Sequence, residues 1–169
     1  MDRIDICTWA NISAEGWSSL LLGNGASIAI HKEFAYPTLH GIADAKGLLA
    51  TTAPIFAKLG TTDFEHVLLA CWYAEHVNGA LGTPSAAISA AYEEVRTALI
   101  EAVHSVHPVH ADVATDLQRV GAFASAFPTV VSLNYDLTLY WAMLLFNAAH
   151  GSWFKDAFHD GEFQTDWDY

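Results

Sequence analysis

The chain has 169 residues, a length that fits one domain, and 53% of them are hydrophobic while only 15% are charged. The 19 acidic and 7 basic residues give a formal net charge of −12. Nucleic acid and anionic membranes are themselves negatively charged, so we expect neither as a general partner. No apolar run reaches the roughly 20 residues of a membrane span. Residues 137–149 come nearest and predict a buried helix.

The N-terminus lacks a basic region followed by an apolar run, so we expect no signal peptide. Cys7 and Cys71 form neither a disulfide framework nor a metal spacing, which favours free thiols in a reducing cytoplasm. The high apolar content indicates either a large core or a surface that a partner chain, a second copy or missing sequence covers. We favour the covered surface.

The elements follow one another in a pattern of strand, turn and helix. Gly23 ends the first apolar run, Pro37 breaks the second, and Pro108 separates two helices. A capping-box pattern from Thr62 to Glu65 starts the clearest helix, and Gly79 is expected to stop it. The predicted elements are a strand over 18–22, a helix over 26–32, a loop over 34–39, a weakly helical stretch over 41–58, helices over 62–78, 84–104 and 111–125, a strand over 128–133 and a helix from 137.

Two strands of the type that is buried on both faces, each followed by a turn and a helix, predict an α/β fold. We expect a Rossmann-like parallel sheet with helices on both faces and a helical insertion, forming a single nucleotide-binding domain over residues 1–169. In open sheets of this kind, ligands bind at the carboxyl ends of the strands.

The first candidate site is the glycine turn, which we define as Gly23, Asn24, Gly25, Ala26 and Ser27. Two glycines permit a tight turn and a close approach of the backbone to a ligand, and the free N–H groups of the following helix favour an anion such as a pyrophosphate. The third glycine of the usual fingerprint is missing. A purely structural strand-to-helix turn is the alternative.

The second candidate site is the polar turn of Asn134, Tyr135 and Asp136, directly after the second strand. It brings amide and carboxylate groups to the same edge of the predicted sheet. The alternative is a helix cap, in which Asn134 or Asp136 bonds the free amides of the next helix.

A strand ending in Gly-Asn-Gly-Ala-Ser, a helical segment beginning Thr-Asp-Phe-Glu at Thr62, and a strand ending in Leu-Asn-Tyr-Asp at Asp136 together resemble the sirtuin-like superfamily. The resemblance covers residues 20–145 and is closest to bacterial sirtuin-like proteins linked to defence and to an uncharacterised family beside them. It implies that Gly23 to Ser27 hold the diphosphate of NAD and that Tyr135 also contacts the nucleotide. It further implies that Asn134 positions a water or hydroxyl at the anomeric carbon.

For Asp136 the resemblance implies a contact to the nicotinamide amide or a role at the start of the helix. Asp63 and Glu65 lie in a segment that recurs in these families, and capping or packing explains them as well as ligand contact does. The chemistry implied is cleavage of the nicotinamide–ribose bond. That step passes through an oxocarbenium-like state and needs an oriented nucleophile and nearby negative or dipolar groups.

Sirtuin-type catalysis also uses a histidine followed by glycine on a later strand. His150-Gly151 is the one such pair here, and His150 also reads as a residue at a helix end, where it complements the dipole. The other interpretation puts the histidine strand beyond Tyr169, which would make the chain a short or truncated member. The triplet His104, His107 and His110 suggests a metal, but Pro108 breaks the register, so we predict an exposed helix end and no metal site.

Three functions follow from these patterns. The first is an NAD hydrolase that releases nicotinamide, used in antiviral defence. The second is a module that binds NAD or ADP-ribose without cleaving it, and the third is an interaction protein. Deacetylation is disfavoured, because the usual sirtuin deacetylases carry a four-cysteine zinc module that two cysteines cannot build.

Overall fold

The computed structural model describes residues 8–159 and 162–163, and most of these residues are helical. The elements are α1 (Trp9–Ile12), β1 (Ser19–Leu22), α2 (Asn24–Ile30), η1 (Lys32–Phe34), α3 (Tyr36–Ala45), α4 (Ala53–Leu59), α5 (Phe64–Leu81), α6 (Ala86–Val106), η2 (His110–Val113), α7 (Ala114–Ala124), β2 (Thr129–Ser132), α8 (Thr138–His150), β3 (Phe158–His159) and β4 (Glu162–Phe163).

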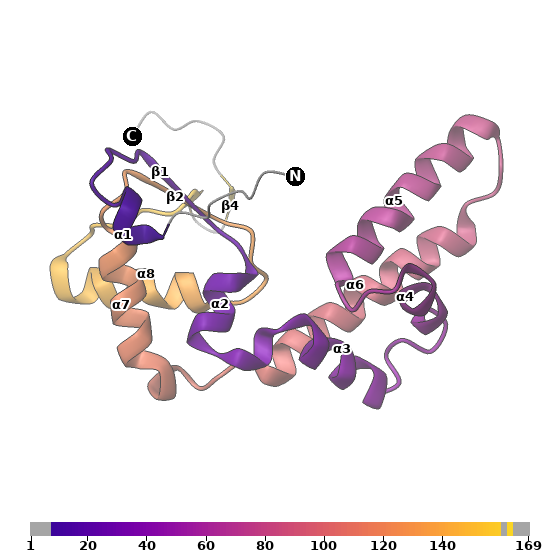
Figure 1. Cartoon of the computed structure of the whole chain (residues 1–169), viewed down its shortest axis with the longest axis horizontal. Coiled ribbons are helices and arrows are strands. Elements are labelled where there is room, and N and C mark those ends of the chain that lie inside the picture. The colour runs from indigo at the N-terminus through magenta and orange to yellow at the C-terminus, as the bar shows by residue number, and fades with distance from the viewer. Residues whose placement is uncertain (1–7, 160–161, 164–169) are drawn as a thin grey trace.

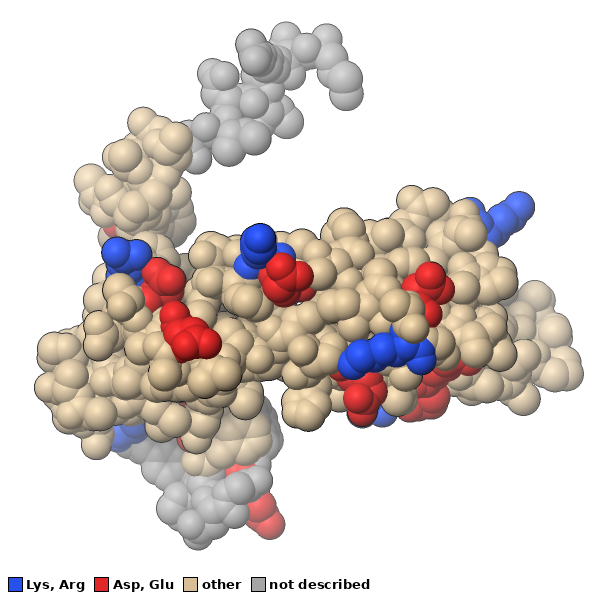
Figure 2. Space-filling view, turned by 90° about the horizontal axis from the view of Figure 1, so that it is seen from below, with Lys and Arg blue, Asp and Glu red and all other residues tan. Residues whose placement is uncertain are grey.

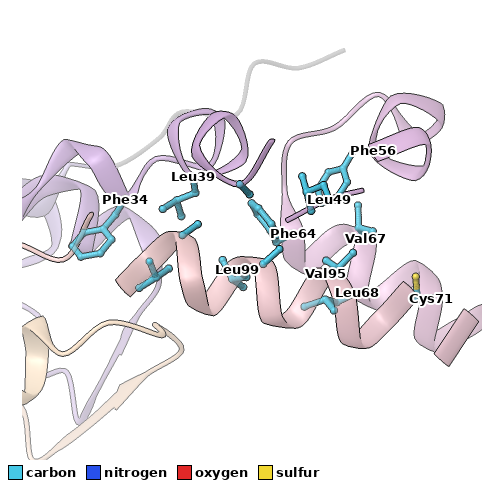
Figure 3. Close-up of a cluster of buried hydrophobic side chains, with 14 residues drawn as sticks. Phe34, Leu39, Leu49, Phe56, Phe64, Val67, Leu68, Cys71, Val95 and Leu99 are labelled. Carbon is cyan, nitrogen blue, oxygen red and sulfur yellow. The ribbon is translucent and has the colours of Figure 1, made fainter. Parts of the chain in front are cut away.

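The chain forms two parts (Figure 1). Strands β1 and β2 lie with α1, α2, α7 and α8 at one end, and α3 to α6 form a helical part from which the α5–α6 hairpin projects. The larger core lies in the helical part, where side chains of α3 to α6 and the segments between them are fully enclosed (Figure 3). Phe64, Val67, Val95 and Leu99 are at its centre. A smaller core joins η2, α7 and α8.

The prediction of a Rossmann-like α/β fold with helices on both faces of a sheet is wrong. β1 and β2 pair in parallel from Ser19↔Thr129 to Leu22↔Ser132, and no further strand joins them within the described residues. β3 and β4 form a separate antiparallel pair. Alternate residues of β1 and most of β2 are exposed, with Leu21 at 64%, so neither strand is buried on both faces. Two short runs of strand-like residues are too few for a layered sheet, and the helical spacing elsewhere governs the fold.

The long helices confirm the predictions made from periodicity, with corrected ends. Asp63 caps α5 by accepting the His66 amide at 3.1 Å, so a carboxylate caps the helix one residue later than the Thr62–Glu65 capping box predicts. The helix runs through Gly79, the predicted stop, and ends at Gly82, whose φ of 68° places it in the left-handed region. Gly82 is therefore the C-terminal signal, because glycine adopts that conformation without a steric penalty.

The segment predicted as a loop over 34–39 is the start of α3. Pro37 lies at the first or second position of that helix, where a proline is tolerated because its missing N–H has no partner inside the helix. The weakly helical stretch resolves into α3 and α4, separated by turns. Residues 152–155, which follow the His150-Gly151 pair, form no strand.

The surface is poor in charge and rich in apolar side chains. Figure 2 shows a face on which charged side chains are few and acidic and basic ones lie close together. Leu21 on β1 and Leu133 after β2 are both more than 60% exposed. The covering chain or copy expected from the composition remains a prediction.

No helix within residues 8–159 and 162–163 is long and apolar enough to cross a membrane. Cys71 is a free, buried thiol, and burial raises its pKa. Two end segments lie largely outside the described residues. They are the N-terminal segment considered for a signal peptide, which includes Cys7, and the acidic, aromatic segment over 160–169.

Candidate functional site

The glycine turn and the polar turn lie side by side at the carboxyl end of the β1–β2 pair. The ladder between the strands continues past β2, because the Leu133 amide donates to the Leu22 carbonyl at 2.9 Å. Gly23 follows β1 directly and is the N-cap of α2. Two segments more than 100 residues apart in sequence therefore meet, as the parallel arrangement predicts (Figure 1).

Ser27 joins the two turns. Its hydroxyl donates to Asp136 Oδ2 at 2.5 Å and accepts from Asn134 Nδ2 at 2.7 Å, and the residue is 0% exposed. A carboxylate only accepts hydrogen bonds and a hydroxyl has one proton, so donation to Asp136 obliges Ser27 to accept from the Asn134 amide. The chain of donors thus fixes the orientation of the Asn134 side chain. Ser27 is too deeply buried to contact a ligand itself.

This orientation leaves Asn134 Oδ1 buried without a hydrogen-bond partner among the described residues. A buried acceptor left unpaired costs roughly 1–3 kcal/mol, so such an atom in a folded protein calls for a water or a ligand donor. Asn134 Oδ1 is therefore an acceptor that the protein holds ready at the meeting point of the two turns.

Asp136 holds the start of α8. Its Oδ1 accepts from the Thr138 amide at 2.8 Å and from the Thr138 hydroxyl, while Oδ2 is taken by Ser27. Both carboxylate oxygens are thus engaged within the protein. Of the two roles considered for Asp136, the structure shows the one at the helix start.

A small cavity opens beside Asn134. Its polar lining comes from both turns and from the helical part, since Asn24, Tyr36, Glu65, Asn134, Tyr135 and Asp136 all contribute to it, together with Phe34, Leu39, Leu99 and Val103. Its volume is about 20 Å³, enough for one water molecule. A whole nucleotide does not fit inside, so only a water or a small group of a ligand can reach Asn134 Oδ1 from this side.

Glu65 is the other carboxylate on this cavity. Tyr36 donates its hydroxyl hydrogen bond to Glu65 Oε2, and Glu65 is half-buried on the first turn of α5. Burial raises the pKa of the Glu65 carboxyl above its ordinary value of 4.5. The side chain is therefore a better proton acceptor than an exposed glutamate.

Glu65 and Tyr135 also line an open groove of about 520 Å³ with Leu68, Leu69, Trp72, Tyr73 and Tyr92. The groove runs along α5 and is mostly aromatic, a lining suited to flat rings. Burial, followed by the negative charge of Glu65, raises the pKa of Tyr135. The one-water cavity and the aromatic groove therefore share two side chains.

The two glycines fit a ligand that approaches the backbone closely. A Cβ added at Gly23 or Gly25 meets no atom within 4 Å, and neither residue has a positive φ. Neither internal packing nor backbone strain accounts for glycine at these positions. Space beside the backbone is what a bound phosphate group uses. Asn24 is held in place, since its Nδ2 donates to the Phe34 carbonyl at 3.1 Å.

The structure does not bring His150 to this site. His150 is the last residue of α8, and the 13 residues of that helix separate it from the polar turn by about 18 Å. It is exposed, and its ring lies 4.2 Å from that of Phe146.

His107 contacts Leu137, the residue that follows the polar turn, and the sequence did not predict this contact. Its Nε2 accepts the Leu137 amide at 3.0 Å, and its ring packs edge-on against Phe34 and Trp141. The His-x-x-His-x-x-His run drew attention to His107 only as a possible metal ligand. Within the described residues, no group of three metal-binding side chains converges.

The comparison with protein families gives one match. The family model described as a domain of unknown function (DUF4917) matches residues 20–169. The chain belongs to this family. The stretch that DUF4917 covers contains the glycine turn, Glu65 and the polar turn, so the whole candidate site lies inside it. No curated protein and no solved structure matches the chain.

Proposed function

We propose that this DUF4917 chain binds NAD at the junction of the glycine turn and the polar turn and hydrolyses its nicotinamide–ribose bond. One observation carries the proposal. The hydrogen bonds from Asn134 through Ser27 to Asp136 fix Asn134 Oδ1 as a buried, unpaired acceptor beside a one-water cavity. An acceptor of this kind can orient a water or a ribose hydroxyl, which is the role that the sirtuin-like resemblance implies for Asn134.

The cavity and the aromatic groove suggest where the different parts of a bound nucleotide would lie. The open space at Gly23 and Gly25 accommodates the diphosphate, and only the reacting end of the ligand reaches the cavity. The aromatic groove offers ring surface next to Tyr135. We place the activity in the cytoplasm, where NAD is available, with NAD depletion during bacterial defence as its use.

The second candidate is a module that binds NAD or ADP-ribose without cleaving it. The position of His150 at the far end of α8 favours this candidate, because it leaves the site without the histidine that sirtuin-type catalysis uses. The two candidates predict the same binding and differ only in product.

Two measurements on the purified protein distinguish the hydrolase from the binding module. Chromatography after incubation with NAD detects released nicotinamide, and calorimetry gives the affinity for ADP-ribose. For a hydrolase, Asn134→Ala should lower the rate of release about 100-fold, the loss typical of removing one preorganised polar group. Asn78→Ala is the matched control, since Asn78 lies near the end of α5 and its side chain donates to the Pro84 carbonyl, away from both turns. Binding without nicotinamide supports the module, and the absence of both binding and release refutes the proposal.

A further inference from the structure

Two of the acceptors that line the one-water cavity belong to different parts of the fold. Asn134 comes from the turn after β2, and Glu65 comes from the first turn of α5. A buried water needs two to four polar partners to be held, and Asn134 Oδ1 has no partner in the described part of the chain. Glu65 Oε2 is engaged by Tyr36, and no partner is found for Oε1 within the described residues. The cavity thus offers the partners that a single water requires.

The chemistry of these partners fixes how the water lies. Asn134 Oδ1 and a carboxylate both accept, so a water between them donates one proton to each. Its oxygen lone pairs then point away from both acceptors, free to attack. A water that is fixed in this way is an oriented nucleophile, and a carboxylate on one of its protons is in position to act as a base.

We infer that Glu65 is the general base of the hydrolysis, acting on a water held between its carboxylate and Asn134 Oδ1. The inference rests on the proposed function and assigns the proton-accepting role that no histidine in the site fills.

The other candidates for this role are engaged or distant. Asp136, the second acid on the cavity, uses both oxygens to hold Ser27 and Thr138. His107 uses Nε2 to accept the Leu137 amide. Glu65 is therefore the acidic or imidazole group on the cavity, among the described residues, that keeps an acceptor atom free.

The surroundings of Glu65 suit a base. Burial raises its pKa, and the Tyr36 hydroxyl donates to the carboxylate and keeps it available as an anion. The titratable side chains that line the cavity or the groove with Glu65 are Tyr36, Tyr73, Tyr92, Tyr135 and Asp136, and Asp63 lies two residues before it. Among the described residues, no lysine or arginine lines either space.

The step balances without any further reactant. The water oxygen forms a bond to the anomeric carbon of the ribose, and the bond from that carbon to the nicotinamide nitrogen breaks. The bonding pair goes to the ring nitrogen, which gives neutral nicotinamide. The water proton goes to Glu65 and from there to solvent. The products are ADP-ribose, nicotinamide and one proton.

Glu65→Gln tests the assignment, because glutamine keeps the shape and the acceptor for Tyr36 but takes no proton. We expect the turnover number for nicotinamide release to fall about 100-fold or more, with the affinity for ADP-ribose unchanged within about threefold. Glu93→Gln is the control, since Glu93 is exposed and pairs only with Arg96 on the surface, and its turnover should match that of the wild type.

The pH profile adds a readout that a structural role would not move. The turnover number of the wild type should rise with pH as Glu65 loses its proton, with a midpoint above 4.5, because burial raises the pKa of Glu65. Tyr36→Phe removes the donor that stabilises the carboxylate, so the midpoint should move to higher pH. The rise should vanish in Glu65→Gln.

The outcomes separate the two proposals. A Glu65→Gln variant with the turnover of the wild type, or an unmoved midpoint in Tyr36→Phe, overturns Glu65 as the base and leaves the proposed hydrolase intact. A wild-type chain that binds ADP-ribose but releases no nicotinamide overturns both the hydrolysis and the base and leaves a binding module. A folded wild-type chain that binds nothing overturns the proposed function and the base together.

Discussion

Replacing Ser27 by alanine should destabilise the protein through two lost hydrogen bonds at one buried atom. The Ser27 hydroxyl is the link between the glycine turn and the polar turn, and the residue is 0% exposed. Without it, Asp136 Oδ2 and Asn134 Nδ2 lose a partner where water has little access. Asp136 keeps its bonds to Thr138, so the start of α8 should persist.

The magnitude follows from the nature of the two bonds. A hydrogen bond to a charged group contributes about 1.5–3 kcal/mol and a neutral one about 0.5–1.5 kcal/mol, so Ser27→Ala should cost about 2–4 kcal/mol. For a chain of this length, 1 kcal/mol corresponds to about 2–4 °C. The midpoint of thermal unfolding should therefore fall by roughly 5–15 °C.

Urea and thermal unfolding of Ser27→Ala and Ser105→Ala provide the measurement. Ser105 is exposed and donates only to the Ala102 carbonyl within α6, so its replacement should change the free energy of unfolding by no more than about 0.5 kcal/mol. The reasoning is refuted if Ser27→Ala unfolds no more easily than Ser105→Ala, because the two turns would then not be linked through this hydroxyl.

Two further substitutions test contacts elsewhere in the fold. At Gly121, where α7 crosses α8, an added Cβ would lie 3.0 Å from the Ala142 carbonyl oxygen. Gly121→Ala should therefore lower the free energy of unfolding, measured with a chemical denaturant, by about 1–3 kcal/mol. An unchanged unfolding midpoint would show that the two helices are less close. Burial alone would raise the pKa of Glu94, but hydrogen bonds from Thr51 and Thr52 outweigh it and lower the pKa below 4.5. Glu94→Gln should therefore lower the free energy of unfolding by about 1–3 kcal/mol at pH 7. The difference in unfolding free energy between variant and wild type should shrink as the pH falls below 4.5, because the wild-type carboxylate then becomes protonated. A difference that stays constant with pH would contradict this.

The sequence was sufficient to locate the long helices and the strand-to-helix turns. Periodicity placed α5 and α6, and the apolar runs that end at Gly23 and Asn134 marked the two junctions. The parallel pairing of β1 and β2 then brings the two turns together. These features depend on local pattern and on one simple rule of strand geometry.

The fold class could not be obtained in the same way. A run such as Val130-Val131 has the same composition in a two-stranded pair as in a buried six-stranded sheet. What distinguishes them is how many other strands pair alongside, which is a property of the whole chain. Pro37 shows a similar ambiguity, because proline breaks a helix in its interior but begins one in its first turn.

The partners within the site also depend on the tertiary fold. From the sequence, Glu65 could equally be interpreted as a capping residue. Its contact with Tyr36, at the start of α3, exists only because the fold brings the starts of α3 and α5 together. His107 reaches the Leu137 amide across 30 residues. No spacing in the sequence encodes either contact.

The central claim is that NAD binds at the meeting point of the two turns, beside Asn134 and Gly25. Titration with NAD, followed by the NMR signals of the Asn134 side-chain amide and the Gly25 backbone amide, tests it most directly. The account predicts saturable shifts of both signals, with the Asn78 side-chain amide unmoved. Saturable binding by calorimetry that leaves the Asn134 and Gly25 signals unchanged would contradict it.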